Sequence, residues 1–180
     1  MVVKINIECT YELALTADLT EATFNSHDKK GHPVMLKVQI KPLYYFLLPN
    51  VYNLSFGPLN DDGIIDDNAQ IFHKDLNKLF STIILFCLTF LRVNPNVTIG
   101  LDGSNDVRAY LYHRIFCSNE ATLCEYFVTL GADWFVRLLR NNDYERDQDG
   151  SPFFKPKTEL FDYQRPARDL YRYYMFHLKK

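Results

Sequence analysis

The residues with the clearest chemical potential lie at a Gly-Ser corner, Gly103 and Ser104. An alternating apolar stretch precedes the corner and a helical pattern follows it, so backbone N–H groups should gather there at the start of a helix. Such amides attract phosphate or carboxylate groups. Arg108 adds a guanidinium that can hold an oxyanion through two parallel hydrogen bonds. We therefore predict an anion- or partner-binding site formed by Gly103, Ser104, Arg108, Tyr112 and His113.

The same corner also has a purely structural interpretation. Ser104 or Asn105 would cap the helix, and Arg108 would pair with Asp102 or Asp106. No lysine follows the glycine as a P-loop requires, and no G-x-S-x-G elbow is present to activate a serine. The sequence thus shows no cofactor motif and no recognisable catalytic set.

A second candidate lies near the C-terminus, where basic and aromatic side chains interleave. Single-stranded nucleic acids bind to surfaces that combine positive charge with rings on which bases stack. The alternative is that the aromatic side chains of a strand pack against helices. The candidate nucleic-acid or partner face consists of Arg165, Arg168, Tyr171, Arg172, Tyr173 and Lys179.

No metal site is expected. The acidic group Asp61, Asp62, Asp66 and Asp67 lacks the spacing of a calcium loop, and a turn followed by a helix start explains it. The four cysteines form no C-x-x-C pair and no zinc pattern with the histidines. We expect reduced thiols in a reducing compartment.

Apolar spacing places these candidates on an α+β fold. We expect a mostly antiparallel twisted sheet of about five to seven short strands packed against two main helices. Trp134–Arg140 fits either a strand or a helix, Asn141–Lys157 reads as a long surface loop, and a helix starting at Arg165 competes with the last strand. The expected strands are Val2–Thr16, Val34–Ile40, Val51–Gly57, Ile64–Ile65, Val97–Leu101, Tyr126–Leu130 and Tyr171–Leu178. The expected helices run from an N-cap at Asn68 to Arg92 and from Asp106 to Cys117.

The size and charge of the chain limit the number of domains and the kinds of partner it can have. Its 180 residues fit a single domain spanning 1–180, and a net charge of −2 gives no global attraction to nucleic acid or anionic membrane. The most apolar stretch, Leu79–Leu91, is shorter than the about 20 residues that span a bilayer. The N-terminus shows no secretory leader. We therefore expect a cytoplasmic protein with no membrane partner.

Two segments carry a resemblance to a known family. Tyr52–Gly57, which precedes the first long helix, and Gly103–Tyr112 resemble an uncharacterised bacterial family, found mostly in Bacteroidota and catalogued as domain of unknown function 6934. The chain departs from the family pattern at Tyr110, where a second arginine is common, and in the longer segment Asn141–Lys157. The resemblance implies the order of strands and helices and transfers no activity.

Three functions remain open. The first is a protein-interaction or regulatory module, with a protein partner or a second copy of the chain, inside an assembly such as a bacterial defence or toxin–antitoxin system. Its many aromatic side chains suit an interface. The second is a nucleic-acid-binding module on the C-terminal face. The third is an enzyme that acts on a phosphorylated small molecule at the Gly103–Arg108 turn, which requires His113 or a carboxylate to converge there.

Overall fold

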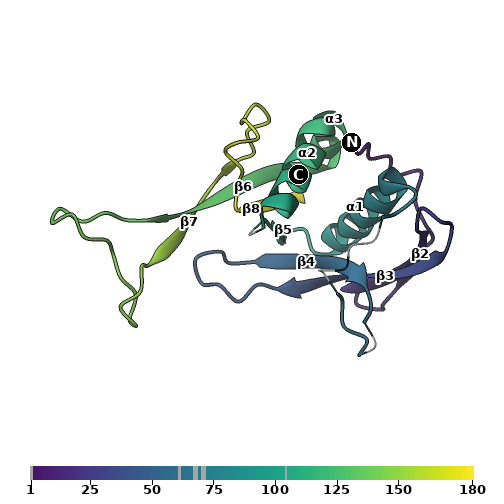
Figure 1. The fold of residues 1–180 in the computed structure, drawn as a ribbon, viewed down its shortest axis with the longest axis horizontal. Coiled ribbons are helices and arrows are strands. Elements are labelled where there is room, and N and C mark those ends of the chain that lie inside the picture. Colours follow the sequence, from purple (N-terminus) through teal and green to yellow (C-terminus); the bar gives the residue numbers. More distant parts are fainter. Residues whose placement is uncertain (1, 61, 67–68, 70–71, 104) are drawn as a thin grey trace.

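The computed structural model describes residues 2–60, 62–66, 69, 72–103 and 105–180. Its framework is one sheet with the strand order β1-β2-β3-β4-β5-β8-β6-β7 (Figure 1). All pairs of neighbouring strands are antiparallel except β4 and β5, which are parallel and joined through the long helix α1. The strands are β1 (Ala14–Leu15), β2 (Glu21–His27), β3 (Pro33–Pro42), β4 (Val51–Pro58), β5 (Thr98–Asp102), β6 (Phe127–Val136), β7 (Phe154–Leu160) and β8 (Tyr173–Leu178).

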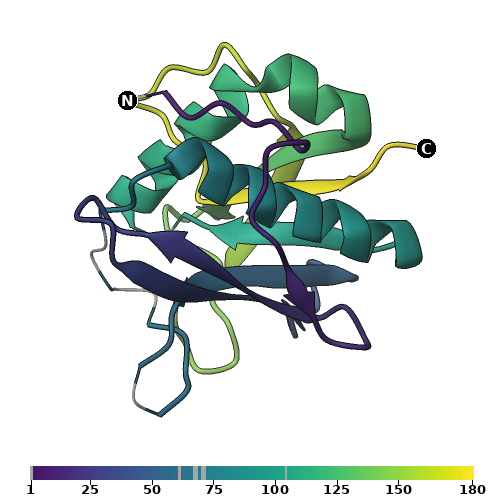
Figure 2. The ribbon, with the colours of Figure 1, turned by 90° about the vertical axis from the view of Figure 1, so that its right-hand side faces the viewer.

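Helices α1 (Leu76–Val93), α2 (Asp106–Ser118) and α3 (Glu120–Tyr126) cover one face of this sheet (Figure 2). The predicted α+β class is confirmed. The described residues form eight strands and three helices, which is more than the five to seven strands and two main helices expected. The sequence analysis missed α3 because its seven residues bury only Leu123, too little to produce a helical pattern.

α1 begins at Leu76, where the Asp75 side chain accepts a hydrogen bond from the Lys78 amide at 2.9 Å. The predicted N-cap Asn68 lies outside the described residues. Almost every residue from Leu79 to Leu91 is buried, so this helix packs on more than one side. By length and composition α1 could cross a membrane, but in this fold 61% of it is buried within the protein.

The predicted strand Val2–Thr16 is wrong for most of its length. Only Ala14 and Leu15 belong to a strand. The preceding residues cross the helices as an extended strap whose amides bind side chains of the helical layer. The Ile5 amide donates at 2.7 Å to Oδ1 of Asn119, which lies between α2 and α3, and the Asn6 amide donates at 2.8 Å to Oγ of Ser81 in α1. The alternating burial of Val3 and Ile5 was read correctly, but the strap packs on helices instead of pairing with a strand.

Several other boundaries differ from the predictions. β2 was missed, and Ile64–Ile65 forms only an isolated bridge from Ile65 to Leu59. The strand expected to end at Leu130 continues to Val136, because Gly131 sits within the sheet. β7 begins inside the segment 141–157 that reads as a loop, and no helix starts at Arg165.

Apolar side chains pack on both faces of the sheet. The main core lies between the sheet and the helices. A smaller cluster on the opposite face is covered by the loop of residues 43–50 between β3 and β4, and it contains Leu48, Val51, Ala132, Tyr173 and Met175. The second cluster holds that loop beside β6, which becomes important for the surface described below.

Candidate functional site

The Gly103 corner lies where β5 ends, and it is built into the sheet. β5 pairs with β8, and the Gly103 amide donates to the carbonyl oxygen of Arg172 at 2.9 Å. A Cβ atom at position 103 would lie 3.1 Å from that oxygen, so glycine suits this close approach. The amide of Gly103 is therefore used inside the protein, where the sequence predicted an outward-facing donor.

Asn105 caps α2. Its Oδ1 atom accepts a hydrogen bond from the Val107 amide at 2.8 Å, which confirms one of the two capping residues named above. The other, Ser104, lies outside the described residues. Residues four apart share one side of a helix, whereas the next residue lies about 100° further round. The predicted site is therefore divided, since Arg108 and Tyr112 lie on one side of α2 and His113 on another.

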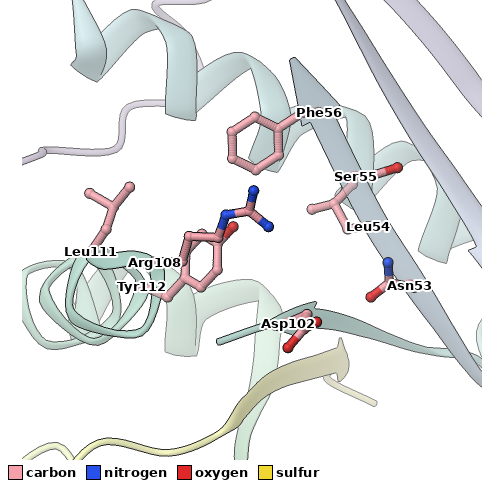
Figure 3. Close-up of a pocket in the computed structure, with 8 residues that line it drawn as sticks. All are labelled: Asn53, Leu54, Ser55, Phe56, Asp102, Arg108, Leu111 and Tyr112. Atoms are coloured by element: carbon pink, nitrogen blue, oxygen red, sulfur yellow. The ribbon is translucent and has the colours of Figure 1, made fainter. Parts of the chain in front are cut away.

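Arg108 and Tyr112 line a pocket of about 240 Å³ between α2 and β4 (Figure 3). The guanidinium of Arg108 extends from the helix toward β4, with the ring of Phe56 on one side and the carboxylate of Asp102 on the other. Asn53 also lines the pocket. The pocket therefore combines a cation, a carboxylate, an amide and two aromatic rings.

The sheet explains why a pocket exists here. β4 and β5 pair only where Val51–Asn53 lies beside Thr98–Gly100. Beyond that point β5 ends at Asp102, while β4 continues along β3 to Pro58, so the two strands leave a gap that α2 covers. The carboxyl ends of parallel strands are where open sheets commonly bind ligands.

A second hollow, of about 530 Å³, lies beside α2 and joins the two predicted sites. Gly103, Asp106 and Tyr110 line it from the corner and the helix. Arg168 and Arg172 line it from the C-terminal segment. Residues that the sequence analysis placed in separate sites therefore share one surface hollow.

His113 lies in the core, away from the Arg108 pocket. Its side chain packs on Phe161, and its Nε2 atom is 3.6 Å from Cys117 Sγ. Burial lowers the pKa of His113 and raises the pKa of Cys117. Both groups are therefore neutral near neutral pH, and the pair lacks the thiolate that a cysteine nucleophile requires.

We expect the free energy of unfolding to decrease as the pH falls from about 7 to about 5, partly because of His113. Its pKa is lower in the folded protein than in the unfolded chain, so in this window the unfolded chain binds more protons and is favoured. His73 contributes in the same direction. The substitution His113→Phe should make the pH dependence shallower in urea unfolding series. An unchanged slope would contradict this role of His113.

The second predicted face is divided between the core and the surface. Tyr171 and Tyr173 are 0% and 6% exposed, so their rings are enclosed by the protein. The guanidinium of Arg165 lies 3.8 Å from the centroid of the Tyr171 ring and pairs with nearby carboxylates. The exposed members of the set are Arg168, Arg172 and Lys179. The six residues thus do not form one exposed sheet face.

Two projecting segments form a surface that the sequence analysis did not identify. We call them together the arm: the hairpin of residues 134–156, which extends β6 and β7, and the loop of residues 43–50. Figure 1 shows both projecting from the same side of the molecule. The hairpin contains most of the segment 141–157 that was read as a surface loop, and residues 43–50 lie between two of the predicted strands.

Contacts between aromatic residues hold the two parts of the arm together. The Tyr45 hydroxyl donates to the carbonyl oxygen of Phe154 at 2.9 Å, and its ring packs edge-on against Trp134. The ring of Phe46 stacks on Phe153 with 6.3 Å between their centroids. A hollow of about 560 Å³ lies beside Phe46 and Phe153.

Large apolar side chains are exposed along the arm. Tyr44 is 94% exposed, Leu138 77% and Phe46 75%. Of the six exposed aromatic residues in the described part of the chain, four belong to the arm. We call the following set the arm patch: Tyr44, Phe46, Leu138, Leu139 and Phe154. Phe135 is also exposed, but it pairs with Lys155 and so lies on the opposite face of the hairpin from Phe154, which pairs with Val136.

The predicted acidic group lies only partly within the described residues, since Asp61 and Asp67 are outside them. Among the side chains that the structure does describe, no three His, Cys, Asp or Glu residues gather closely enough to hold a metal ion. The candidate sites are thus the Arg108 pocket, the hollow beside α2 and the arm patch.

The fold and the pocket define a class of α+β protein with a crevice at the parallel pair β4–β5. The chain belongs to the family of unknown function DUF6934, whose model matches residues 8–152. The match includes the segments Tyr52–Gly57 and Gly103–Tyr112 that carried the resemblance. No curated protein and no solved structure matches the chain.

Proposed function

We propose that this chain is a protein-interaction module and that the arm patch is its binding surface. The observation that supports the proposal is the concentration of exposed aromatic residues on the two projecting segments. Exposed apolar clusters of this kind mark interaction sites, because leaving them in water is unfavourable and promotes aggregation. Aromatic side chains also dominate the energetic centres of protein interfaces.

The internal contacts of the arm favour binding. The bond from Tyr45 to Phe154 and the stacking of Phe46 on Phe153 fix the loop against the hairpin before any partner arrives. A surface held in one conformation loses little conformational entropy on binding. The arm patch therefore has both the chemistry and the order of an interface.

The charges of the hairpin favour a protein partner over nucleic acid. Residues 134–156 contain four basic and four acidic side chains, so the hairpin carries no net charge. Nucleic-acid binding depends on an excess of positive charge that replaces counterions. A balanced rim around an apolar centre is typical of protein interfaces and also allows a second copy of the chain to bind. The cytoplasmic location and a setting in a bacterial defence or toxin–antitoxin assembly stay predictions.

Photo-crosslinking in native cells tests the proposal. A crosslinking amino acid at position 138 should give one discrete product. A product of twice the chain mass would identify a second copy, and any other mass a different protein. The substitution Phe46→Asp in the same chain should remove the product, because burying a charge at the centre of an apolar contact costs roughly several kcal/mol of binding free energy.

The matched control carries the same amino acid at Met35, which is 52% exposed on β3 and lies outside the arm. Position 35 should give no discrete product. Absence of a product at position 138, or a product that survives Phe46→Asp, would overturn the proposed function.

A further inference from the structure

We infer that the pocket between β4 and α2 binds a small ligand through an oxyanion group, a phosphate or a carboxylate. The pocket is separate from the arm patch, with which it shares no residue. At about 240 Å³ it is smaller than the pockets of roughly 300–1,000 Å³ that hold drug-sized molecules. The ligand is therefore a compact metabolite rather than a large cofactor.

Arg108 supplies the positive charge of the pocket. Its side chain is half-buried, and its guanidinium lies inside the pocket between Phe56 and Asp102 (Figure 3). A guanidinium has five N–H donors in one plane, so it can keep contacts within the protein and bind two oxygens of a ligand as well. The surrounding rings of Phe56 and Tyr112 reduce the access of water and strengthen such a charge-assisted bond.

Asn53 supplies an oriented amide. The Tyr173 hydroxyl donates to Asn53 Oδ1 at 2.9 Å, which leaves the amide nitrogen as the donating end of this side chain. Burial, together with the charge of Asp102, raises the pKa of Tyr173, so the hydroxyl keeps its proton and remains a donor. The Tyr173 ring lies directly against Gly100, which fixes its position.

The backbone of β4 borders the pocket. The Leu43 amide donates to the Val51 carbonyl at 2.8 Å, which identifies the β4 residues that bond to β3. In an antiparallel pair, residues that bond to the partner strand alternate with residues whose N–H and C=O point away from it. Val51 bonds to β3, and counting from Val51 places Phe56 among the residues that point away. On that side β4 is paired with β5 only as far as Asn53, and at Pro58 the same edge is occupied by Asp66, whose amide donates to the Pro58 carbonyl at 2.8 Å.

Asp102 determines which oxyanion ligands fit. Its carboxylate lines the same pocket as Arg108 and would repel a ligand that carries negative charge alone. A hydroxyl or amino group on the ligand would instead donate to it. The pocket chemistry therefore matches a phosphate or carboxylate compound that also carries a hydroxyl or amine.

Calorimetric titration tests the inference, with glycerol 3-phosphate, glycolate and acetate as probes. We expect saturable binding of glycerol 3-phosphate or glycolate, and weaker binding of acetate, which has no group that can donate to Asp102. Binding of glycerol 3-phosphate alone identifies a phosphate ester, and binding of glycolate identifies a hydroxy acid. Arg108→Gln should weaken binding roughly tenfold or more, and Arg108→Lys should weaken it less, because lysine keeps the charge without the paired donors.

The control variant is Arg114→Gln on the same helix, where the arginine contacts Tyr110 instead of the pocket. It should bind the probes as the unmodified protein does. Should Arg108→Gln fail to fold, Asn53→Asp supplies a second readout, because it adds a negative charge to the pocket and should also weaken binding. No saturable binding of any probe, or equal losses in the Arg108 and Arg114 variants, would overturn the inference without affecting the proposal for the arm.

Discussion

Replacing Gly131 with alanine is expected to destabilise the protein by about 3 kcal/mol, at the upper end of the usual cost of overpacking. A Cβ atom at this position would lie 2.5 Å from the ring of Tyr171. That ring cannot move away easily, because it is fully buried, its hydroxyl donates to Glu159 at 2.8 Å, and Arg165 lies on its face. Urea unfolding of the variant should show a midpoint well below that of the unmodified protein.

A double-mutant cycle provides the control. Tyr171→Ala removes the ring that a methyl group at position 131 would strike. In that background Gly131→Ala should cost far less than it does alone, because residues in contact are not additive. Equal costs in both backgrounds, or a Gly131→Ala variant as stable as the original, would show that the close approach of ring and glycine is not important for stability.

Replacing Arg165 with methionine is expected to cost about 2–3 kcal/mol, as loss of one partner of a partly buried ion pair does. The Arg165 side chain is 11% exposed, and its guanidinium nitrogens lie 2.8 Å from Asp133, 2.9 Å from Asp169 and 3.6 Å from Glu159. These contacts attach the segment between β7 and β8 to the sheet. Thermal and urea unfolding would measure the loss.

The matched control is Arg146→Met in the arm. Arg146 pairs with Asp143 at 3.2 Å, but both side chains are 44% exposed, and such surface pairs contribute less than about 1 kcal/mol. The melting temperature and urea midpoint of this variant should be close to those of the unmodified protein. Comparable losses in the two variants would mean that the guanidinium of Arg165 has no special structural role.

Local patterns in the sequence predicted β3, β4, β5, α2 and β8 close to where they lie. The burial of β3 alternates as a half-buried strand should, whereas consecutive buried residues in β5 and β8 reflect a sheet that is covered on both faces. The N-terminal strap shows the limit of this approach. Alternation in Val3 and Ile5 reports that one side of the chain is buried, but it does not say whether hydrogen bonds go to a strand or to side chains such as Asn119.

The candidate sites were predictable only in part, because they depend on contacts between distant segments. The sequence analysis identified Arg108 and Tyr112, but not Asn53, which reaches the same pocket from another strand. Helical geometry alone predicts that His113 lies outside this pocket, because adjacent residues of a helix point in different directions and His113 directly follows Tyr112. The arm was not predicted because Gly150, Pro152 and many charged residues are typical of loops. The pairing of β7 with β6 joins separate segments, so it leaves no pattern within either segment.

The accessibility of the arm patch in native cells tests the central claim most directly. Leu138→Cys, in a chain where the exposed Cys9 is replaced by serine, would be labelled with a maleimide in intact native cells and after purification. A partner that covers the arm predicts labelling roughly tenfold slower in cells than in the purified protein, with Met35→Cys as the reference that labels equally in both. Equal rates at position 138 in cells and in purified protein would contradict the claim that the arm binds another protein.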